Sequence, residues 1–327
     1  MSDLYPLKFK TIYLDKIWGG NRLKTILNKD YGQLPNCGES WEISGVEGNI
    51  SVVDNGFLAG NNLHELIEIY MGELVGDEVF KQFGEEFPLL IKFIDAQQDL
   101  SIQVHPNDKL SKERHNAYGK TEMWYVVDAE DGALINSGFN QEVSKEKYVE
   151  YTKNGKLTEL LHYDKTDEGD VFFIPAGRVH AIGKGALVAE IQQTSDVTYR
   201  IFDYNRKDDE GNERELHTDF AVDAIDFSYK DEYKTKYEVE LNKSSEVVSC
   251  NYFTTNILKF DSSIEKNYNQ LDSFIIYINL DGDFEIEYNG GTITVNKGET
   301  VLIPASLETF QLKPLTKEVK TLEVYIK

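Results

Sequence analysis

The fold is decided by the stretch LLIKFIDAQQDLSIQVHPNDKLSKERHNAYGKTEMWY (residues 89–125). Its first residues form an apolar run that is typical of a buried strand and leads into the segment IQVH. Because side chains alternate along a strand, we expect Gln103 and His105 on one face, with Ile102 and Val104 on the other. The stretch therefore predicts two metal-ligand-type side chains on one face of a single strand.

Two further groups complete this set. Glu122 opens the apolar run MWYVV, and His180 follows a strand and a turn within EGDVFFIPAGRVHAIG (residues 168–183). Two imidazole nitrogens and two oxygens suit a borderline cation such as zinc better than magnesium or calcium. The apolar strands around these groups would bury them, and buried polar groups need partners. The residues alone leave one alternative open, in which each group is a hydrogen-bonded structural residue.

Several segments resemble the motifs of the type I phosphomannose isomerases, which interconvert mannose 6-phosphate and fructose 6-phosphate. The likeness starts near IWGG and GESWEIS and covers most of the first two-thirds of the chain. QVHPND is the most specific motif, whereas PAG-x-x-H recurs across the wider cupin superfamily. The resemblance implies one zinc ion per chain, bound by Gln103, His105, Glu122 and His180. The segments that carry it are PLLIKFIDAQQDLSIQVHPND (88–108), GKTEMWYV (119–126), PAGRVHAI (175–182) and EIQQTSDVTYRIFD (190–203).

The strand pattern LVAEIQQ places Glu190 on the same face as Val188 and Gln192. An acid in so apolar a strand is either paired structurally or has a pKa tuned for proton transfer. Lys92, inside the apolar run LLIKFIDA, is either paired or part of the site, and we expect it to be paired. The sequence alone leaves the role of Glu190 open.

The resemblance implies a zinc-dependent aldose–ketose isomerase that works through an enediol, with Lys120, Glu190 and Arg200 as catalytic and substrate-binding residues. Glu190 and Arg200 match an acid and an arginine that the family spaces ten residues apart. Glu190 or a zinc-bound hydroxide would carry the proton. Lys120 would polarise O1 and O2, and Arg200 would engage the phosphate or an oxyanion. The segment IFDYNR departs from the larger members, so the phosphate contacts stay open.

Composition restricts the class of protein. The 327 residues carry a formal charge of −23, which argues against nucleic acid as a partner. No apolar stretch approaches the roughly 20 residues of a membrane span, and the start MSDLYPLKF lacks the features of a signal peptide. We therefore expect a cytoplasmic protein that does not bind membranes, with Cys37 and Cys250 as reduced thiols. A few basic residues at the site would offset the charge for a sugar phosphate substrate, because salt screens the overall field.

An internal repeat organises the fold. GDVFFIPAGRVHAI (169–182) and GETVLIPASLETFQL (298–312) share one pattern, in which Thr309 stands where the first copy has His180. The pattern predicts a mainly β protein with two cupin-type, jelly-roll antiparallel barrels and a few inserted helices. We expect residues 1–230 to form the catalytic metal-binding unit, and residues 231–327 a degenerate cupin without metal.

Two other function classes are compatible with a cupin. One is a non-catalytic module that binds sugar or metal, although such a binder has no need of an acid in an apolar strand. The other is a different cupin enzyme such as an iron oxygenase, for which the Gln-x-His start is unsuited. We expect a monomer or weak homodimer acting on a small sugar phosphate.

Overall fold

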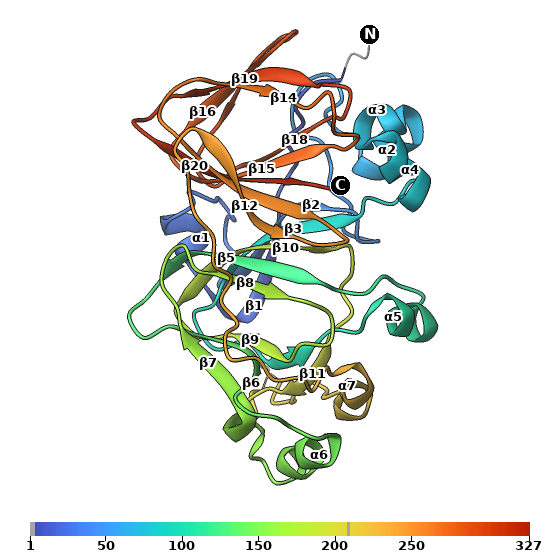
Figure 1. Ribbon diagram of the computed structural model, residues 1–327, viewed down its shortest axis with the longest axis vertical. Coiled ribbons are helices and arrows are strands. Elements are labelled where there is room, and N and C mark those ends of the chain that lie inside the picture. The colour runs from blue at the N-terminus through green and yellow to red at the C-terminus, as the bar shows by residue number, and fades with distance from the viewer. Residues whose placement is uncertain (1–3, 208–209) are drawn as a thin grey trace.

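The computed structural model describes residues 4–207 and 210–327, which form four antiparallel sheets, two in each half of the chain (Figure 1). In the first half, one sheet has the strand order β1 (Ile12–Gly20), β2 (Cys37–Ser44), β3 (Leu89–Asp95), β10 (Ala186–Gln193), β5 (Glu122–Ala129), β8 (Val171–Ile174). The other has the order β11 (Tyr199–Phe202), β4 (Ile102–Val104), β9 (His180–Ile182), β6 (Leu134–Phe139), β7 (Leu161–Lys165). The prediction of a mainly β cupin-type fold is confirmed.

The second half repeats this arrangement. Its larger sheet has the order β12 (Lys243–Ser249), β13 (Thr254–Phe260), β20 (Val319–Tyr325), β15 (Ile275–Asp281), β18 (Thr300–Ile303). Its smaller sheet has the order β14 (Ile264–Asn267), β19 (Thr309–Pro314), β16 (Phe284–Tyr288), β17 (Gly291–Val295). Strands β9 and β19 begin at His180 and Thr309, the two positions that the internal repeat aligns.

The strand β10 is the centre of the first half because both of its faces are buried. Leu187, Ala189 and Ile191 pack into a core that includes residues of β15 and β20. Val188, on the opposite face, packs between the two sheets of the first half with apolar residues such as Trp124. The predicted alternation along this strand is confirmed, and the two halves share one apolar core.

Short helices lie outside the sheets. Asn62 caps α2 (Leu63–Tyr70) with a capping box, and Ser144 caps α6 (Lys145–Lys153). In Figure 1, α6 and α7 lie at the end of the molecule farthest from the second half. The remaining helices are α1 (Arg22–Thr25), α3 (Gly72–Val75), α4 (Asp77–Phe83), α5 (Asp108–His115), the 3-10 helix η1 (Leu157–Leu160) and α7 (Thr218–Ala224).

The division of the chain at residue 230 stays a prediction. Beyond this point the backbone N–H of Thr235 still donates a hydrogen bond to the carbonyl of Val171 in β8, and the hydroxyl of Tyr237 donates one to the carbonyl of Gly169. The expected first unit also includes residues 1–3 and 208–209, which lie outside the described residues. Cys37 and Cys250 are free thiols, as expected. No helix among the described residues is long and apolar enough to cross a membrane.

Candidate metal centre

Three ligand-type side chains meet where the two sheets of the first half face each other. His105 follows β4, Glu122 is the first residue of β5, and His180 is the first residue of β9. One donor atom from each lies within 4.8 Å of the others, and all three residues are buried. The Nε2 atoms of His105 and His180 lie 3.5 and 3.4 Å from the two carboxylate oxygens of Glu122. The sheets therefore bring together three of the four predicted ligands.

The fourth predicted ligand, Gln103, lies beside this cluster. It pairs directly with His180 across β4 and β9, and its Nε2 atom is 3.3 Å from Nε2 of His180. Oxygen and nitrogen of a glutamine amide are distinguished only through their hydrogen bonds. A rotation of the Gln103 amide group by 180° exchanges its oxygen and nitrogen, so that the oxygen faces Nε2 of His180. Gln103 is therefore within reach of an ion held by the other three residues.

The histidine rings are held in the tautomer that a metal requires. Nδ1 of His105 lies 3.0 Å from the carbonyl of Val197, and Nδ1 of His180 lies 2.8 Å from the carbonyl of Arg178. A proton on each Nδ1 serves these bonds and leaves the lone pair of each Nε2 directed at Glu122. Burial lowers the pKa of both histidines, to about 4 for His180, so the rings are neutral.

The cluster leaves polar atoms without partners. Nε2 of His105 and both carboxylate oxygens of Glu122 are buried and form no hydrogen bond with any described residue. Burial, with the nearby charge of Glu190, raises the pKa of Glu122 to about 8. Lys120 forms an ion pair with one oxygen of Glu122 at 3.4 Å, which leaves the other oxygen and the histidine nitrogen without a cation. Buried polar atoms without hydrogen bonds are costly, and a cation at the centre of the cluster would satisfy all of them. The residues therefore fit a bound metal ion.

Lys120 lies at the edge of the cluster. Its side chain is buried, and its Nζ atom is 3.4 Å from a carboxylate oxygen of Glu122. Lys120 lies two positions before Glu122, with one residue between them, so both side chains face the same way in extended backbone. The structure thus places a buried ammonium group beside the predicted ligands.

Glu190 lies on β10, the neighbour of strand β5, which carries Glu122. Its Oε1 accepts a hydrogen bond of 2.9 Å from the indole of Trp124, and its Oε2 is 3.0 Å from Nζ of Lys92. Burial raises its pKa, but the charges of Lys92 and Lys120 outweigh this effect and lower it to about 2. The expected pairing of Lys92 is confirmed. The ring of Trp124 also contacts His180, with centroids 5.3 Å apart, and so connects Glu190 with the cluster.

Arg200 lies on β11, directly opposite Gln103 of β4. Directly opposed residues of antiparallel strands share a face, so Arg200 and Gln103 project from the same side of the sheet. The guanidinium group of Arg200 donates to the carbonyl of Glu215 at 2.9 Å, and no described contact joins it to the metal cluster. Its Nε is buried without a partner. Arg200 therefore retains donor capacity near the predicted ligands.

Two more arginines lie near Arg200 around a buried carboxylate. Arg206 and Arg214 both form ion pairs with Asp203, and the Nε of Arg214 lies 2.7 Å from it. None of these three residues was predicted from the sequence to belong to the site. An acid directly after the apolar strand residues IF was the available signal for Asp203, whereas nothing in the segment around Arg214 marks it out.

Each half of the chain consists of two facing antiparallel sheets, and the first half holds a buried cluster of metal-ligand-type side chains. These features define a cupin-type protein with a candidate metal centre. Residues 7–136 match the family model "Phosphomannose isomerase type I, catalytic domain", and residues 243–319 match "Mannose-6-phosphate isomerase, cupin domain". The chain is 36% identical to mannose-6-phosphate isomerase ManA of Bacillus subtilis, over 94% of this chain and 96% of that protein. It is 35% identical to mannose-6-phosphate isomerase of Streptococcus mutans, over 94% of each.

Solved structures agree with these relatives. The crystal structure of the mannose 6-phosphate isomerase from Bacillus subtilis covers 98% of this chain and 99% of its own, with a TM-score of 0.88 and 33% identity. A putative mannosephosphate isomerase from Archaeoglobus fulgidus shares the fold, with a TM-score of 0.80, 21% identity and 99% coverage of both chains. The chain belongs to the type I phosphomannose isomerases, a family of sugar phosphate isomerases. The resemblance seen in the sequence is thus confirmed.

Proposed function

We propose that the chain interconverts mannose 6-phosphate and fructose 6-phosphate, with one zinc ion bound by Gln103, His105, Glu122 and His180. The unpartnered donor atoms of the buried cluster carry this proposal, since they call for a cation. Two neutral imidazoles, one carboxylate and one amide favour zinc over the hard cations magnesium and calcium. When bound, the ion supplies Lewis-acid stabilisation of charge that develops on the substrate's carbonyl and hydroxyl oxygens.

Lys120 orients the reacting end of the sugar. Its ammonium group is buried beside Glu122, so water competes little for its donor hydrogens. A fixed donor in such surroundings stabilises negative charge that forms on O1 or O2 as the enediol develops. Lys120 thus positions the substrate oxygens O1 and O2 and stabilises the negative charge that develops on either of them.

Glu190 moves the proton between C1 and C2. Lys92 keeps its carboxylate ionised, which is the form that accepts a proton. The low pKa makes Glu190 a weak base, so transfer requires a C–H group that is itself acidified. The positive charges of Lys120 and of the bound ion, placed next to the substrate oxygens O1 and O2, would make this C–H group more acidic. Trp124 fixes the orientation of the carboxylate through its indole N–H.

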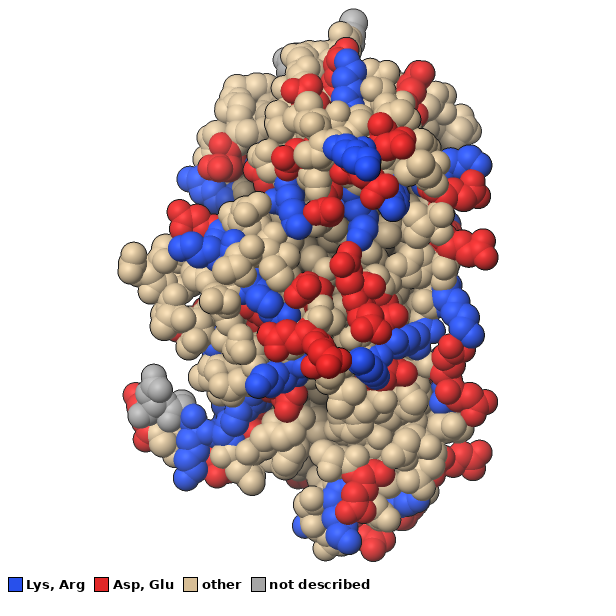
Figure 2. All heavy atoms as spheres, turned by 90° about the vertical axis from the view of Figure 1, so that its left-hand side faces the viewer, with Lys and Arg blue, Asp and Glu red and all other residues tan. Residues whose placement is uncertain are grey.

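Arg200 binds the phosphate, assisted by Arg206 and Arg214. These three guanidinium groups face one carboxylate, Asp203, so the group retains positive charge. In Figure 2 a run of basic side chains crosses the lower half of the molecule among acidic ones. Guanidinium groups bind phosphate through paired hydrogen bonds. Local positive charge of this kind draws in a dianion despite the formal charge of −23.

A coupled assay of mannose 6-phosphate conversion tests the proposal on purified protein, before and after chelation and with zinc added back. We expect activity to disappear with the chelator and to return with zinc. Retained activity after complete metal removal would refute the metal assignment. Zinc-loaded protein that binds the sugar phosphate without converting it would be a non-catalytic binding cupin. A cytoplasmic location and a monomeric or weakly dimeric state stay predictions from the sequence.

A further inference from the structure

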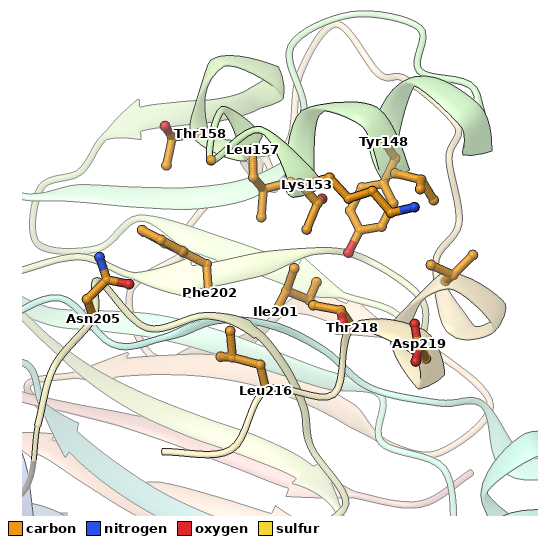
Figure 3. A pocket seen from close by; sticks show the side chains of 14 residues that line it. Tyr148, Lys153, Leu157, Thr158, Ile201, Phe202, Asn205, Leu216, Thr218 and Asp219 are labelled. Atoms are coloured by element: carbon orange, nitrogen blue, oxygen red, sulfur yellow. The ribbon is translucent and has the colours of Figure 1, made fainter. Parts of the chain in front are cut away.

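A separate cavity of about 400 Å³ lies between α6, η1, β11 and the segment that leads into α7 (Figure 3). None of the predicted metal ligands lines it. Ile201 and Phe202 of β11 both line the cavity whereas Arg200 does not, because the pairing of β11 with β4 is irregular between Arg200 and Phe202. Most of its walls are apolar, including Val149, Leu157, Ile201, Phe202, Leu216 and Val222.

Three hydrogen-bond donors of α6 line this cavity, and none has a partner outside this helix among the described residues. Tyr148 is 1% exposed, and the only group near its hydroxyl that can share a hydrogen bond with it is the buried hydroxyl of Thr152, one turn further along α6. Figure 3 shows the Tyr148 hydroxyl directed from α6 toward β11. Burial raises the pKa of Tyr148, and the nearby Thr152 offsets this only in part. Lys153, exposed at the rim, forms no ion pair with any residue in 4–207 or 210–327.

We propose that this cavity binds a small aromatic carboxylate. Its volume lies in the range of about 300–1,000 Å³ that is typical of small-molecule sites, and apolar walls with a few polar groups suit a ring. A carboxylate accepts hydrogen bonds from Tyr148 and Thr152 and pairs with the ammonium group of Lys153. The exposed carboxylate of Asp219, on α7, repels an anion, so the head group binds at the α6 side.

The cavity is connected to Arg200 through the chain that closes it. Leu216 and Thr218 line the cavity and flank His217. The backbone N–H of His217 donates to the carbonyl of Arg200 at 2.7 Å, and the N–H of Arg200 donates to Nδ1 of His217 at 3.1 Å. The carbonyl of Glu215, one residue before Leu216, accepts from the guanidinium group of Arg200. A ligand that packs on Leu216 and Thr218 therefore steadies the position of Arg200.

This coupling rests on the proposed function, in which Arg200 binds the substrate phosphate. Arg200 acts on binding rather than on the chemical step. Occupation of the cavity therefore lowers KM for mannose 6-phosphate, by about two- to five-fold, and leaves kcat nearly unchanged.

Saturation-transfer NMR with 3-phenylpropionate tests the binding site directly. We expect transfer to the ring protons with the wild-type protein, weaker binding of neutral 3-phenylpropan-1-ol, and loss of transfer with Val149→Trp, which fills the cavity. Lys153→Gln weakens binding by up to about five-fold, the range of an exposed ion pair. Lys156→Gln, a neighbouring lysine that does not line the cavity, leaves binding unchanged.

Absence of transfer with the wild-type protein, or equal transfer with a folded Val149→Trp variant, overturns the site. If Val149→Trp does not fold, Leu216→Trp fills the cavity from an exposed position. The same probe is then added to the mannose 6-phosphate assay. Binding without a change in KM overturns the coupling alone. Binding to a protein that has no isomerase activity refutes the proposed function and leaves the binding site standing.

Discussion

Gln103 and His180 are directly opposed on the antiparallel strands β4 and β9, with their Nε2 atoms 3.3 Å apart. On the other side of β4, Gln103 is opposed by Arg200 of β11. One row across three strands therefore carries two predicted metal ligands and the predicted phosphate ligand. Directly opposed residues share a face, so this register alone directs all three side chains to one side of the sheet.

His105→Ala is expected to abolish both zinc retention and turnover. The variant removes one of the two neutral imidazoles and leaves Glu122 with a single histidine partner. Metal content by mass spectrometry and the coupled assay measure the two effects. His64→Ala is the control, because His64 is an exposed residue of α2 that pairs with Glu85. A His105→Ala variant with full activity and no zinc would rule out the assignment.

Glu190→Gln is expected to retain zinc and to lose about two to four decades of kcat, the usual contribution of a general base. The amide keeps the shape of the side chain but cannot accept the proton. Steady-state kinetics together with metal analysis separates this outcome from loss of the metal. Turnover within a factor of a few of the wild type would assign the proton to another group.

The second half supplies a matched control for this variant. Glu323 lies opposite Tyr277 in β20 and β15, as Glu190 lies opposite Trp124 in β10 and β5. Glu323 pairs with Lys266 at 2.6 Å and accepts from Asn256 at 2.9 Å.

Glu323→Gln is expected to destabilise the protein by about 1–3 kcal/mol, because buried donors lose a charged acceptor. It leaves kcat unchanged. Urea unfolding and the coupled assay on the two variants check this contrast, and a loss of kcat in Glu323→Gln equal to that of Glu190→Gln would contradict it.

Lys92→Met is expected to move the acidic limb of the pH–activity profile upward. In the native protein, burial raises the pKa of Glu190, but Lys92 and Lys120 lower it to about 2, so its base form persists at every moderately acidic pH. Without Lys92, burial dominates and raises this pKa, so activity falls as the pH drops through the new value. The profile of kcat/KM between pH 4 and 8 measures the shift. An unchanged acidic limb would show that ionisation of Glu190 does not limit the reaction.

Arg200→Lys is expected to raise KM for mannose 6-phosphate by about ten-fold, because a lysine keeps the charge but loses the paired donors of the guanidinium group. The effect on kcat is smaller. Lys207→Gln serves as the control, since Lys207 is an exposed neighbour. Kinetics at low and high salt check the result: equal losses in both variants would reduce the role of Arg200 to general electrostatic attraction.

The sequence by itself determined the local features of this protein. The alternation of β10, the Gln-x-His pair on one strand, the caps of α2 and α6 and the internal repeat all follow from residues close together in the chain. Periods of two and 3.6 residues, and capping side chains, act over a few residues, so their signals are present in the sequence.

Only the tertiary structure decided which partners these residues meet. Glu190 finds Lys92 and Trp124 because β10 lies between β3 and β5, a register set by long-range packing of apolar faces. The pairing of Arg206 and Arg214 with Asp203 likewise depends on how the chain returns after β11. The pKa of a buried acid depends on its neighbours in space, so the sequence alone left the role of Glu190 open, and only the fold places beside it the Lys92 ammonium group that favours its ionised form.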